Sequence, residues 1–111
     1  MLIGFANSKL QRICSSAKEI HRKWGPQIGM KIQARLQQLE ALDSLADVRQ
    51  LPGLRCHELK AEREGSLSID LVHPHRLVFR PADQPRPIKA DGGLDWTGVK
   101  AITIEEVVDY H

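Results

Sequence analysis

The sequence predicts an α+β fold, in which an N-terminal helical hairpin packs on one face of a small antiparallel β-sheet. Two changes along the chain predict it. Apolar residues between positions 8 and 39 recur at three- and four-residue spacing, which is the period of a helix. After position 53 they recur at every second residue, which is the period of a strand. The length of 111 residues suits one hydrophobic core, so we expect a single domain over residues 1–111.

The first helix should follow a short apolar strand at Leu2–Ala6. Ser8 can cap this helix, and Gln11 three residues later completes a capping box. Gly25-Pro26 ends it, because Gly suits the position after a helix and Pro the first turn of the next. The apolar face of the first helix comprises Leu10, Ile13, Cys14, Ala17, Ile20 and Trp24.

The second helix has its own apolar stripe and should pack antiparallel to the first, because the connection between them is short. Residues 43–53 form a connector, in which Ser44 can cap a single helical turn and Pro52-Gly53 closes the segment. The apolar stripe of the second helix comprises Ile28, Ile32, Leu36 and Leu39.

Four strands are expected to form the sheet. They are Arg55–Lys60, Leu67–Leu71, His75–Arg80 and Ala101–Val107. Leu67–Leu71 alternates apolar and polar residues, so one face of that strand is buried. In His75–Arg80 the core face is Leu77 and Phe79. Residues expected on the other face, which the helices leave open, are Lys60, Arg76, Val78 and Arg80, whereas those expected inward on the remaining strands are Leu59, Ile102 and Ile104.

Residues 81–98 break the strand pattern. They contain three prolines and the run Asp91-Gly92-Gly93, which favour turns. We interpret this segment as a long loop or a mobile arm inserted between two strands.

Positive charge is concentrated near the N-terminus, although the net charge of the chain is only +2. Between positions 9 and 35 only Glu19 opposes seven cations. Such a concentration attracts polyanions, so we predict an RNA-binding surface here, the alternative being merely the solvated face of two helices. The predicted RNA-binding residues are Lys9, Arg12, Lys18, Arg22, Lys23, Lys31, Arg35 and, on the sheet, Arg80.

Several classes of protein are disfavoured by the sequence. No apolar run approaches the roughly 18 residues of a membrane span, and the N-terminus lacks the features of a secretory signal. Cys14 and Cys56 are too few to staple a domain of this size, so we expect reduced thiols and a cytoplasmic protein. The spacing of Cys56 and the histidines fits no standard metal site, and we expect neither a metal nor another cofactor.

The open sheet face carries groups that could act on a phosphate. Arg offers a planar fork of donors and Lys a point charge, which suits Arg76 and Lys60 to that task. The terminal Asp109-Tyr110-His111 adds groups that can move protons. Together they could cleave RNA without a metal, through attack by the substrate's own 2′-hydroxyl. Surface cations and a terminal His usually have no catalytic role, so this pattern by itself is weak evidence.

The chain resembles toxins of the RelE/ParE superfamily, specifically the HigB-like plasmid maintenance killer branch. The resemblance runs essentially end to end and includes the order of two helices followed by strands. It departs at residues 81–98, because short family members join the corresponding strands with little between them. The matching blocks are Phe5–Leu10 (FANSKL), Leu51–Lys60 (LPGLRCHELK), Ser68–Phe79 (SIDLVHPHRLVF), Asp91–Trp96 (DGGLDW) and Glu106–His111 (EVVDYH).

The resemblance implies an enzyme that cleaves messenger RNA on the ribosome, with contacts to ribosomal RNA. It also implies a cognate, HigA-like antitoxin as protein partner and contact with DNA only through the antitoxin complex. No membrane partner is implied. The residues that it assigns to cleavage are Lys60, Arg76, Asp109, Tyr110 and His111.

Two alternatives to a ribonuclease stay open at this point. Relatives of the ParE type poison DNA gyrase by binding it, because one fold can serve different functions. The chain could also be a degenerate toxin that acts only as an antitoxin partner and co-repressor. The terminal Asp109-Tyr110-His111 and the pair Lys60 and Arg76 favour the nuclease.

Overall fold

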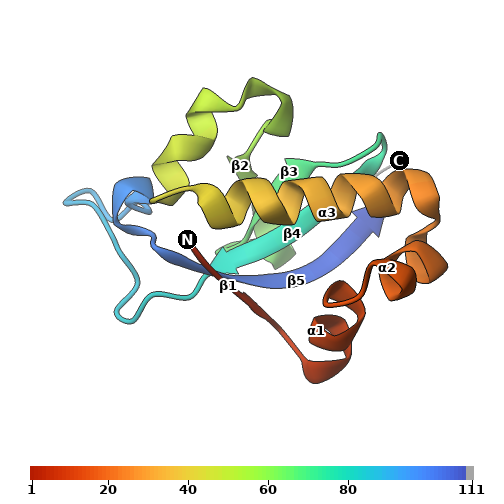
Figure 1. Cartoon of the computed structure of the whole chain (residues 1–111). Coiled ribbons are helices and arrows are strands. Elements are labelled where there is room, and N and C mark those ends of the chain that lie inside the picture. Colours follow the sequence, from red (N-terminus) through yellow and green to blue (C-terminus); the bar gives the residue numbers. More distant parts are fainter. Residues whose placement is uncertain (110–111) are drawn as a thin grey trace.

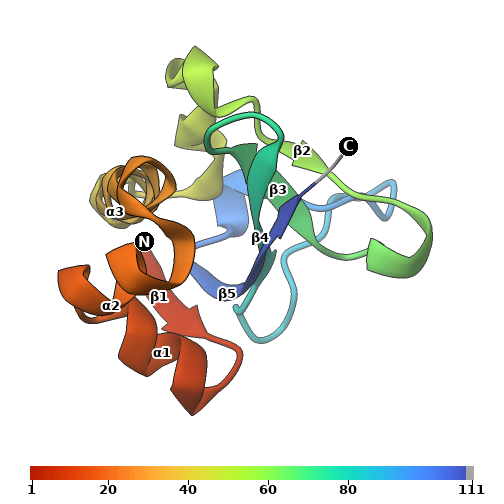
Figure 2. The same ribbon diagram turned by 90° about the vertical axis from the view of Figure 1, so that its right-hand side faces the viewer.

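A computed structural model describes residues 1–109 of the chain, which form two layers (Figure 1). One layer is a five-stranded sheet in the order β1-β5-β4-β3-β2, and three helices cover one of its faces (Figure 2). This arrangement confirms the predicted α+β class. The strands are β1 (Leu2–Phe5), β2 (His57–Glu58), β3 (Leu67–Asp70), β4 (His75–Pro81) and β5 (Ala101–Asp109).

The sheet is mixed, so the expectation of a wholly antiparallel sheet was wrong at one edge. Strand β1 pairs in parallel with β5, in the register Leu2 to Ala101. The other three pairings are antiparallel. A parallel pair needs a long crossover, and here the helices and the other strands lie between β1 and β5 in the chain.

The first predicted helix is two helices, which meet at Ser15-Ser16. Ser16 has an extended backbone, and its Oγ accepts a hydrogen bond from the Glu19 N–H at 3.2 Å. A side chain that caps a new helix competes with continuation of the previous one. Asn7, rather than Ser8, caps the first helix by accepting from the Leu10 N–H at 2.8 Å. The helices are α1 (Ser8–Cys14), α2 (Ala17–Trp24) and α3 (Pro26–Ala41).

Helices α2 and α3 form the predicted hairpin around Gly25-Pro26. Gly25 has a φ of +85°, and Pro26 is the first residue of α3. The two helices pack closely at Gly29, where a Cβ atom would lie 2.5 Å from Cδ2 of His21. The absence of a side chain at Gly29 therefore sets the distance between α2 and α3.

The core lies between the helices and the sheet. The side chains expected there from β4 and β5 are buried, which confirms the inward positions of Leu77, Phe79, Ile102 and Ile104. Val78 is also fully buried but lies outside this cluster, opposite Ser68 and Glu106 in the register. The helix-free face of the sheet, opposite α1–α3, is thus not uniformly exposed to solvent.

A β-bulge in β5 decides which residues face the core. Val78 pairs with Glu106 and Phe79 with Ile104, so Glu105 has no residue opposite it. The extra residue allows Ile104 and Val107, which are three positions apart, to contact the core on the same face.

The predicted strand Arg55–Lys60 is shorter in the structure. Only β2 pairs with β3, and Leu59 is half-buried outside the core cluster, so its predicted inward position was wrong. Arg55 and Ala61 have positive φ values of 47° and 57°, which turn the backbone on either side of β2. The short 3₁₀ helices are η1 (Leu45–Gln50), η2 (Pro52–Leu54), η3 (Ala61–Arg63) and η4 (Trp96–Gly98).

Residues 81–98 form a loop that packs against the sheet instead of a detached arm. Ile88 and Leu94 form an isolated antiparallel bridge, and Leu94 is buried in the core cluster. The carboxylate of Asp83 accepts hydrogen bonds from the N–H groups of Lys100 and Ala101 at 3.0 to 3.2 Å. These contacts attach the loop to the start of β5.

Candidate active site

Arg76 is held in place on the helix-free face by three acceptors, two on β3 and one just before β2. Its Nε donates to Ser68 Oγ at 2.8 Å, and its Nη2 donates to the Arg55 carbonyl at 3.1 Å. Its Nη1 forms an ion pair with Asp70, the residue directly opposite on β3. Only 14% of the Arg76 side chain is exposed, so these contacts fix the guanidinium in one orientation.

The charge around Arg76 stays positive despite the carboxylate beside it. Asp70 also lies 3.6 Å from Nη1 of Arg55, whose side chain is 75% exposed. One carboxylate therefore faces two guanidinium groups. The excess positive charge is available to an anion that approaches from solvent.

Lys60 and Arg76 line one hollow of about 540 Å³ on the helix-free face. Lys60 is exposed and immediately precedes η3, where the backbone turns through Ala61. The other lining residues are His57, Leu59, Ala61, Glu62 and Arg63. The two cations expected to hold a phosphate are thus brought together from segments 16 residues apart in the sequence.

His57 belongs to this hollow and was not identified as a site residue from the sequence. Its Nδ1 lies 3.2 Å from Nη2 of Arg76 and 3.1 Å from the Arg55 carbonyl. A bare Nδ1 accepts from Arg76, whereas a protonated Nδ1 donates to the carbonyl, so only one of the two hydrogen bonds forms at a time. The pairing of β2 with β3 brings His57 here, and no local pattern of residues signals it.

Asp109 ends β5 opposite His75, and its Oδ2 lies 3.9 Å from Nε2 of that residue. His75 and Arg76 both line a second hollow of about 280 Å³. Asp109 is therefore near the Arg76 end of the site and does not line the hollow that contains Lys60. The other two candidate catalytic residues, Tyr110 and His111, lie outside the described residues.

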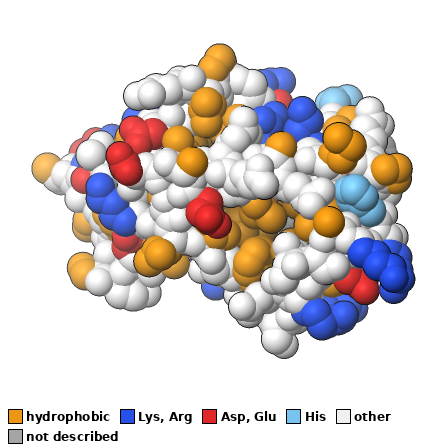
Figure 3. Space-filling view, viewed as in Figure 1, with side chains coloured by type: hydrophobic (Ala, Val, Ile, Leu, Met, Phe, Trp, Pro, Cys, Tyr) orange, Lys and Arg blue, Asp and Glu red, His pale blue; other side chains and the backbone are white. Residues whose placement is uncertain are grey.

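The cations of α1 and α2 lie on the helical layer, away from Lys60 and Arg76. Figure 3 shows Lys and Arg side chains gathered at the lower right, where α1 and α2 lie. Lys31 on α3 is half-buried, and Lys23 lies over the Trp24 ring at 5.6 Å. The exposed residues of this helical patch are Lys9, Arg12, Lys18, Arg22 and Lys23.

Arg35 was wrongly predicted to face RNA. Its side chain is buried and joins α3 to the sheet, since Nε donates to the Asp70 carbonyl at 2.8 Å and Nη2 to the Gly53 carbonyl at 3.4 Å. Burial lowers the pKa of the Arg35 guanidinium, and the nearby Asp70 carboxylate partly offsets that effect. The remaining predicted RNA contact, Arg80, is exposed but paired with Glu105 at 3.2 Å.

The two thiols do not belong to the site. Burial raises the pKa of Cys14 to about 11 and that of Cys56 to about 12, so both are protonated and poorly nucleophilic near neutral pH. Among residues 1–109, no group of three His, Cys, Asp or Glu side chains is arranged to hold a metal ion. No helix in the same range is long and apolar enough to cross a membrane.

Comparison with known proteins identifies the fold. No protein-family model and no curated protein matches the sequence. Among solved structures, a YoeB/ParE toxin from Agrobacterium tumefaciens matches with a TM-score of 0.55 and 12% identity, over 100% of both chains. A YoeB–YefM complex from Staphylococcus aureus matches with a TM-score of 0.56 and 19% identity, over 100% of this chain and 98% of that one. The chain therefore has the fold of these toxins.

Proposed function

We propose that this chain is the toxin of a type II toxin–antitoxin pair and a ribosome-dependent messenger RNA endoribonuclease. The observation that carries the proposal is the hollow shared by Lys60 and Arg76 on the helix-free face. Two cations at one open hollow suit a phosphodiester, and the likeness to YoeB/ParE toxins supports the biological class.

Arg76 would bind the scissile phosphate. A guanidinium has five N–H donors, and the contacts to Ser68, Asp70, Arg55 and His57 use at most four of them. At least one donor is left for a phosphate oxygen. Lys60 would add a second positive charge as the attacked phosphorus gains its fifth oxygen.

The cleavage step needs no water or metal. The 2′-oxygen of the substrate forms a bond to the adjacent phosphorus as its proton passes to a base. The bond from phosphorus to the 5′-oxygen breaks, and an acid protonates that oxygen. The products are a 2′,3′-cyclic phosphate and a 5′-hydroxyl. The resemblance assigns Asp109, Tyr110 and His111 to cleavage. We propose His111 as acid or base, Tyr110 as a group that stacks on a base or helps to transfer a proton, and Asp109 as a base or an orienting group. His57 is a further candidate for proton transfer because it contacts Arg76.

Two macromolecular partners complete the proposal. The helical patch would bind ribosomal RNA, because exposed Lys and Arg side chains attract phosphate. A HigA-like antitoxin would silence the toxin and connect it to DNA. The S. aureus neighbour, which is a complex with a second protein, supports a protein partner of this kind.

The test is induced expression of the chain with mapping of the 5′ ends of cellular messages, beside Arg76→Ala and Lys60→Ala. We expect cuts in phase with codons, and their loss in both variants without loss of the fold. Lys89→Ala is the matched control, because this exposed lysine lies outside the hollow. Unchanged cutting in either variant would remove its residue from the mechanism.

A second test addresses the C-terminal residues. A bulky tag after His111 should slow cleavage much more than the same tag before Met1. Equal cleavage by both tagged proteins would argue against a role for Tyr110 and His111.

The gyrase-poison alternative keeps one supporting observation, since the description of the A. tumefaciens neighbour names ParE as well as YoeB. Intact messages with arrested growth and DNA-damage signalling would favour it. Intact messages with normal growth would indicate a toxin that has lost its activity.

A further inference from the structure

A further hollow, the loop hollow, lies on the other side of Lys60. It measures about 450 Å³ and shares Leu59 and Lys60 with the hollow of the candidate active site. Its opposite wall consists of residues from the 81–98 loop, namely Arg86 and the segment 92–94. The two hollows thus form neighbouring compartments, with Lys60 at the boundary between them.

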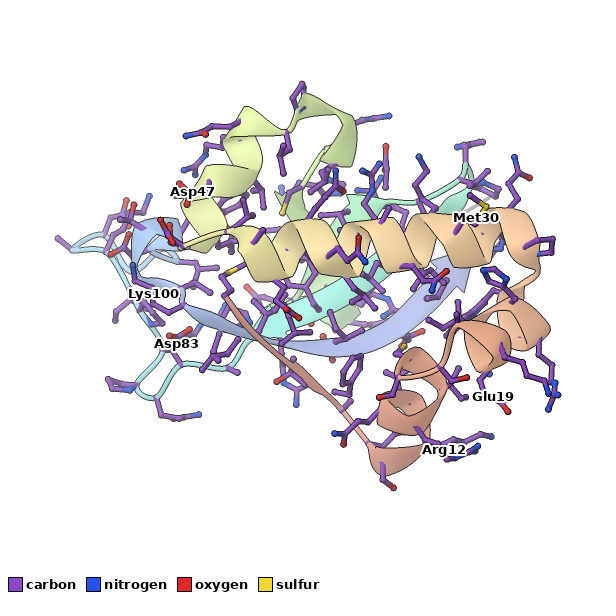
Figure 4. The ribbon with its side chains drawn as sticks, viewed as in Figure 1. Arg12, Glu19, Met30, Asp47, Asp83 and Lys100 are labelled. Atoms are coloured by element: carbon purple, nitrogen blue, oxygen red, sulfur yellow. The ribbon has the colours of Figure 1, made fainter. Side chains whose placement is uncertain are left out.

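The loop wall is fixed to the rest of the molecule at several points. Nε1 of Trp96 donates to Oε2 of Glu58 at 3.0 Å, and the guanidinium of Arg49 lies 4.3 Å from the centre of the Trp96 ring. Leu94 is anchored in the core. Asp83 holds the other end of the loop to the backbone at Lys100, and Figure 4 shows these two residues close together. The wall is therefore preorganised.

The chemistry of the loop hollow suits a nucleotide. Within residues 1–109, Arg86 is held by one hydrogen bond, from Nη2 to the Gly65 carbonyl at 3.3 Å, which leaves most of its donors for a phosphate. Glu58 and Glu64 contribute carboxylates, which can accept from the amino groups of bases. Two cations with acceptors beside them fit a nucleotide better than an apolar protein segment.

We propose that the hollow between Lys60 and the 81–98 loop is a subsite for the nucleotide next to the cleaved bond, with Arg86 on its phosphate. This inference rests on the proposed nuclease function. Lys60 lies between the two compartments and would contact the phosphate that joins the two nucleotides. The inserted loop would then determine which message sequences bind well.

The experiment measures toxin binding to ribosomes programmed with a message that carries a 2′-deoxy nucleotide at the cleavage position. We expect Arg86→Ala to weaken binding roughly tenfold. Lys89→Ala is the control, because this lysine belongs to the same loop but does not line the hollow, and we expect a change below about twofold. Arg86→Lys should restore part of the affinity. Binding of Arg86→Ala equal to that of the wild type would overturn the subsite.

Message length supplies a second criterion. A message that lacks the neighbouring nucleotide should bind wild type and Arg86→Ala equally well, because the subsite would be empty in both. A difference that persists with the short message would overturn the assignment. So would a loss of antitoxin binding with unchanged message binding, which would make the loop a protein-binding surface.

Cleavage of the matching all-ribose message separates this inference from the function on which it rests. If the wild type cleaves and Arg86→Ala binds and cleaves like it, only the subsite fails. If the wild type neither binds nor cleaves, the proposed function fails with it. Equal unfolding midpoints for Arg86→Ala and the wild type would show that any loss reflects binding.

Discussion

Asp70 and Arg76 stand directly opposite each other on β3 and β4, and their side chains form an ion pair beneath the candidate phosphate site. The pair is partly buried, with 24% of the Asp70 side chain and 14% of the Arg76 side chain exposed. Asp70 therefore orients Arg76 without occupying all of its donors. The positions of both residues follow from the register of two adjacent strands.

Asp70→Asn tests whether this orientation matters. The amide keeps the shape of the carboxylate and one of its two acceptor oxygens, but it removes the charge. We expect a small loss of stability, about 1 kcal/mol, because Ser68 and the Arg55 carbonyl still hold Arg76. Cleavage should fall by about tenfold, since a looser guanidinium binds phosphate less well. Urea unfolding and single-turnover cleavage measure the two quantities. Unchanged cleavage would show that the ion pair is dispensable.

Arg35→Met should destabilise the protein without weakening RNA binding by the folded fraction. The change leaves the partly buried carbonyls of Asp70 and Gly53 without this donor. We expect a loss of about 3 kcal/mol in the free energy of unfolding. The exposed cation Lys18 provides the control, and Lys18→Met should leave stability nearly unchanged. A folded Arg35→Met protein with impaired ribosome binding would instead support the original sequence-based prediction.

The helical patch should govern the salt dependence of ribosome binding. Replacing Lys18, Arg22 and Lys23 together with Gln removes three exposed charges. We expect the slope of log affinity against log salt to become shallower by about 2. Titrations at several salt concentrations measure this slope. A slope equal to that of the wild type would mean that the patch is only a solvated helix surface.

The thiols should reduce stability in alkaline solution. The pKa of Cys14 is raised to about 11 and that of Cys56 to about 12, from 9.0 for an unperturbed thiol, because both are partly buried. The folded state therefore holds the thiol protons more tightly than the unfolded state does. The contribution of the two thiols to the free energy of unfolding is complete below pH 9 and declines as the pH rises from 9 toward 12. Unfolding at pH 8 and pH 10 measures the effect.

The double variant Cys14→Ala Cys56→Ala isolates this contribution from that of other groups that titrate in the same range. Its free energy of unfolding should fall less between pH 8 and pH 10 than that of the wild type. A parallel fall in both proteins would contradict the assignment to the thiols.

Local pattern was sufficient to determine much of this fold. The apolar stripe of α3, the Gly25-Pro26 junction and the inward residues of β4 and β5 were all predictable. Each depends on residues a few positions apart, whose spacing fixes which side of a helix or strand they occupy. The pair Lys60 and Arg76 was predicted as a phosphate site from the same spacing and from the family resemblance, and the structure places both residues at one hollow.

Tertiary structure decided what depends on contacts between distant segments. The parallel pairing of β1 with β5 joins the two ends of the described chain, and no local period encodes it. Arg35 lies on a helix rich in solvent-facing polar residues, yet its side chain is buried and donates hydrogen bonds to the carbonyls of Gly53 and Asp70. His57 joins Arg76 only because β2 pairs with β3.

The same distinction applies to the 81–98 loop. Its prolines and glycines predict an irregular segment, because they restrict or free the backbone locally. Its position beside Lys60 depends on Leu94 entering the core and on Trp96 reaching Glu58. Burial and hydrogen bonding across the chain set such positions, and their free energy exists only once the whole fold is assembled.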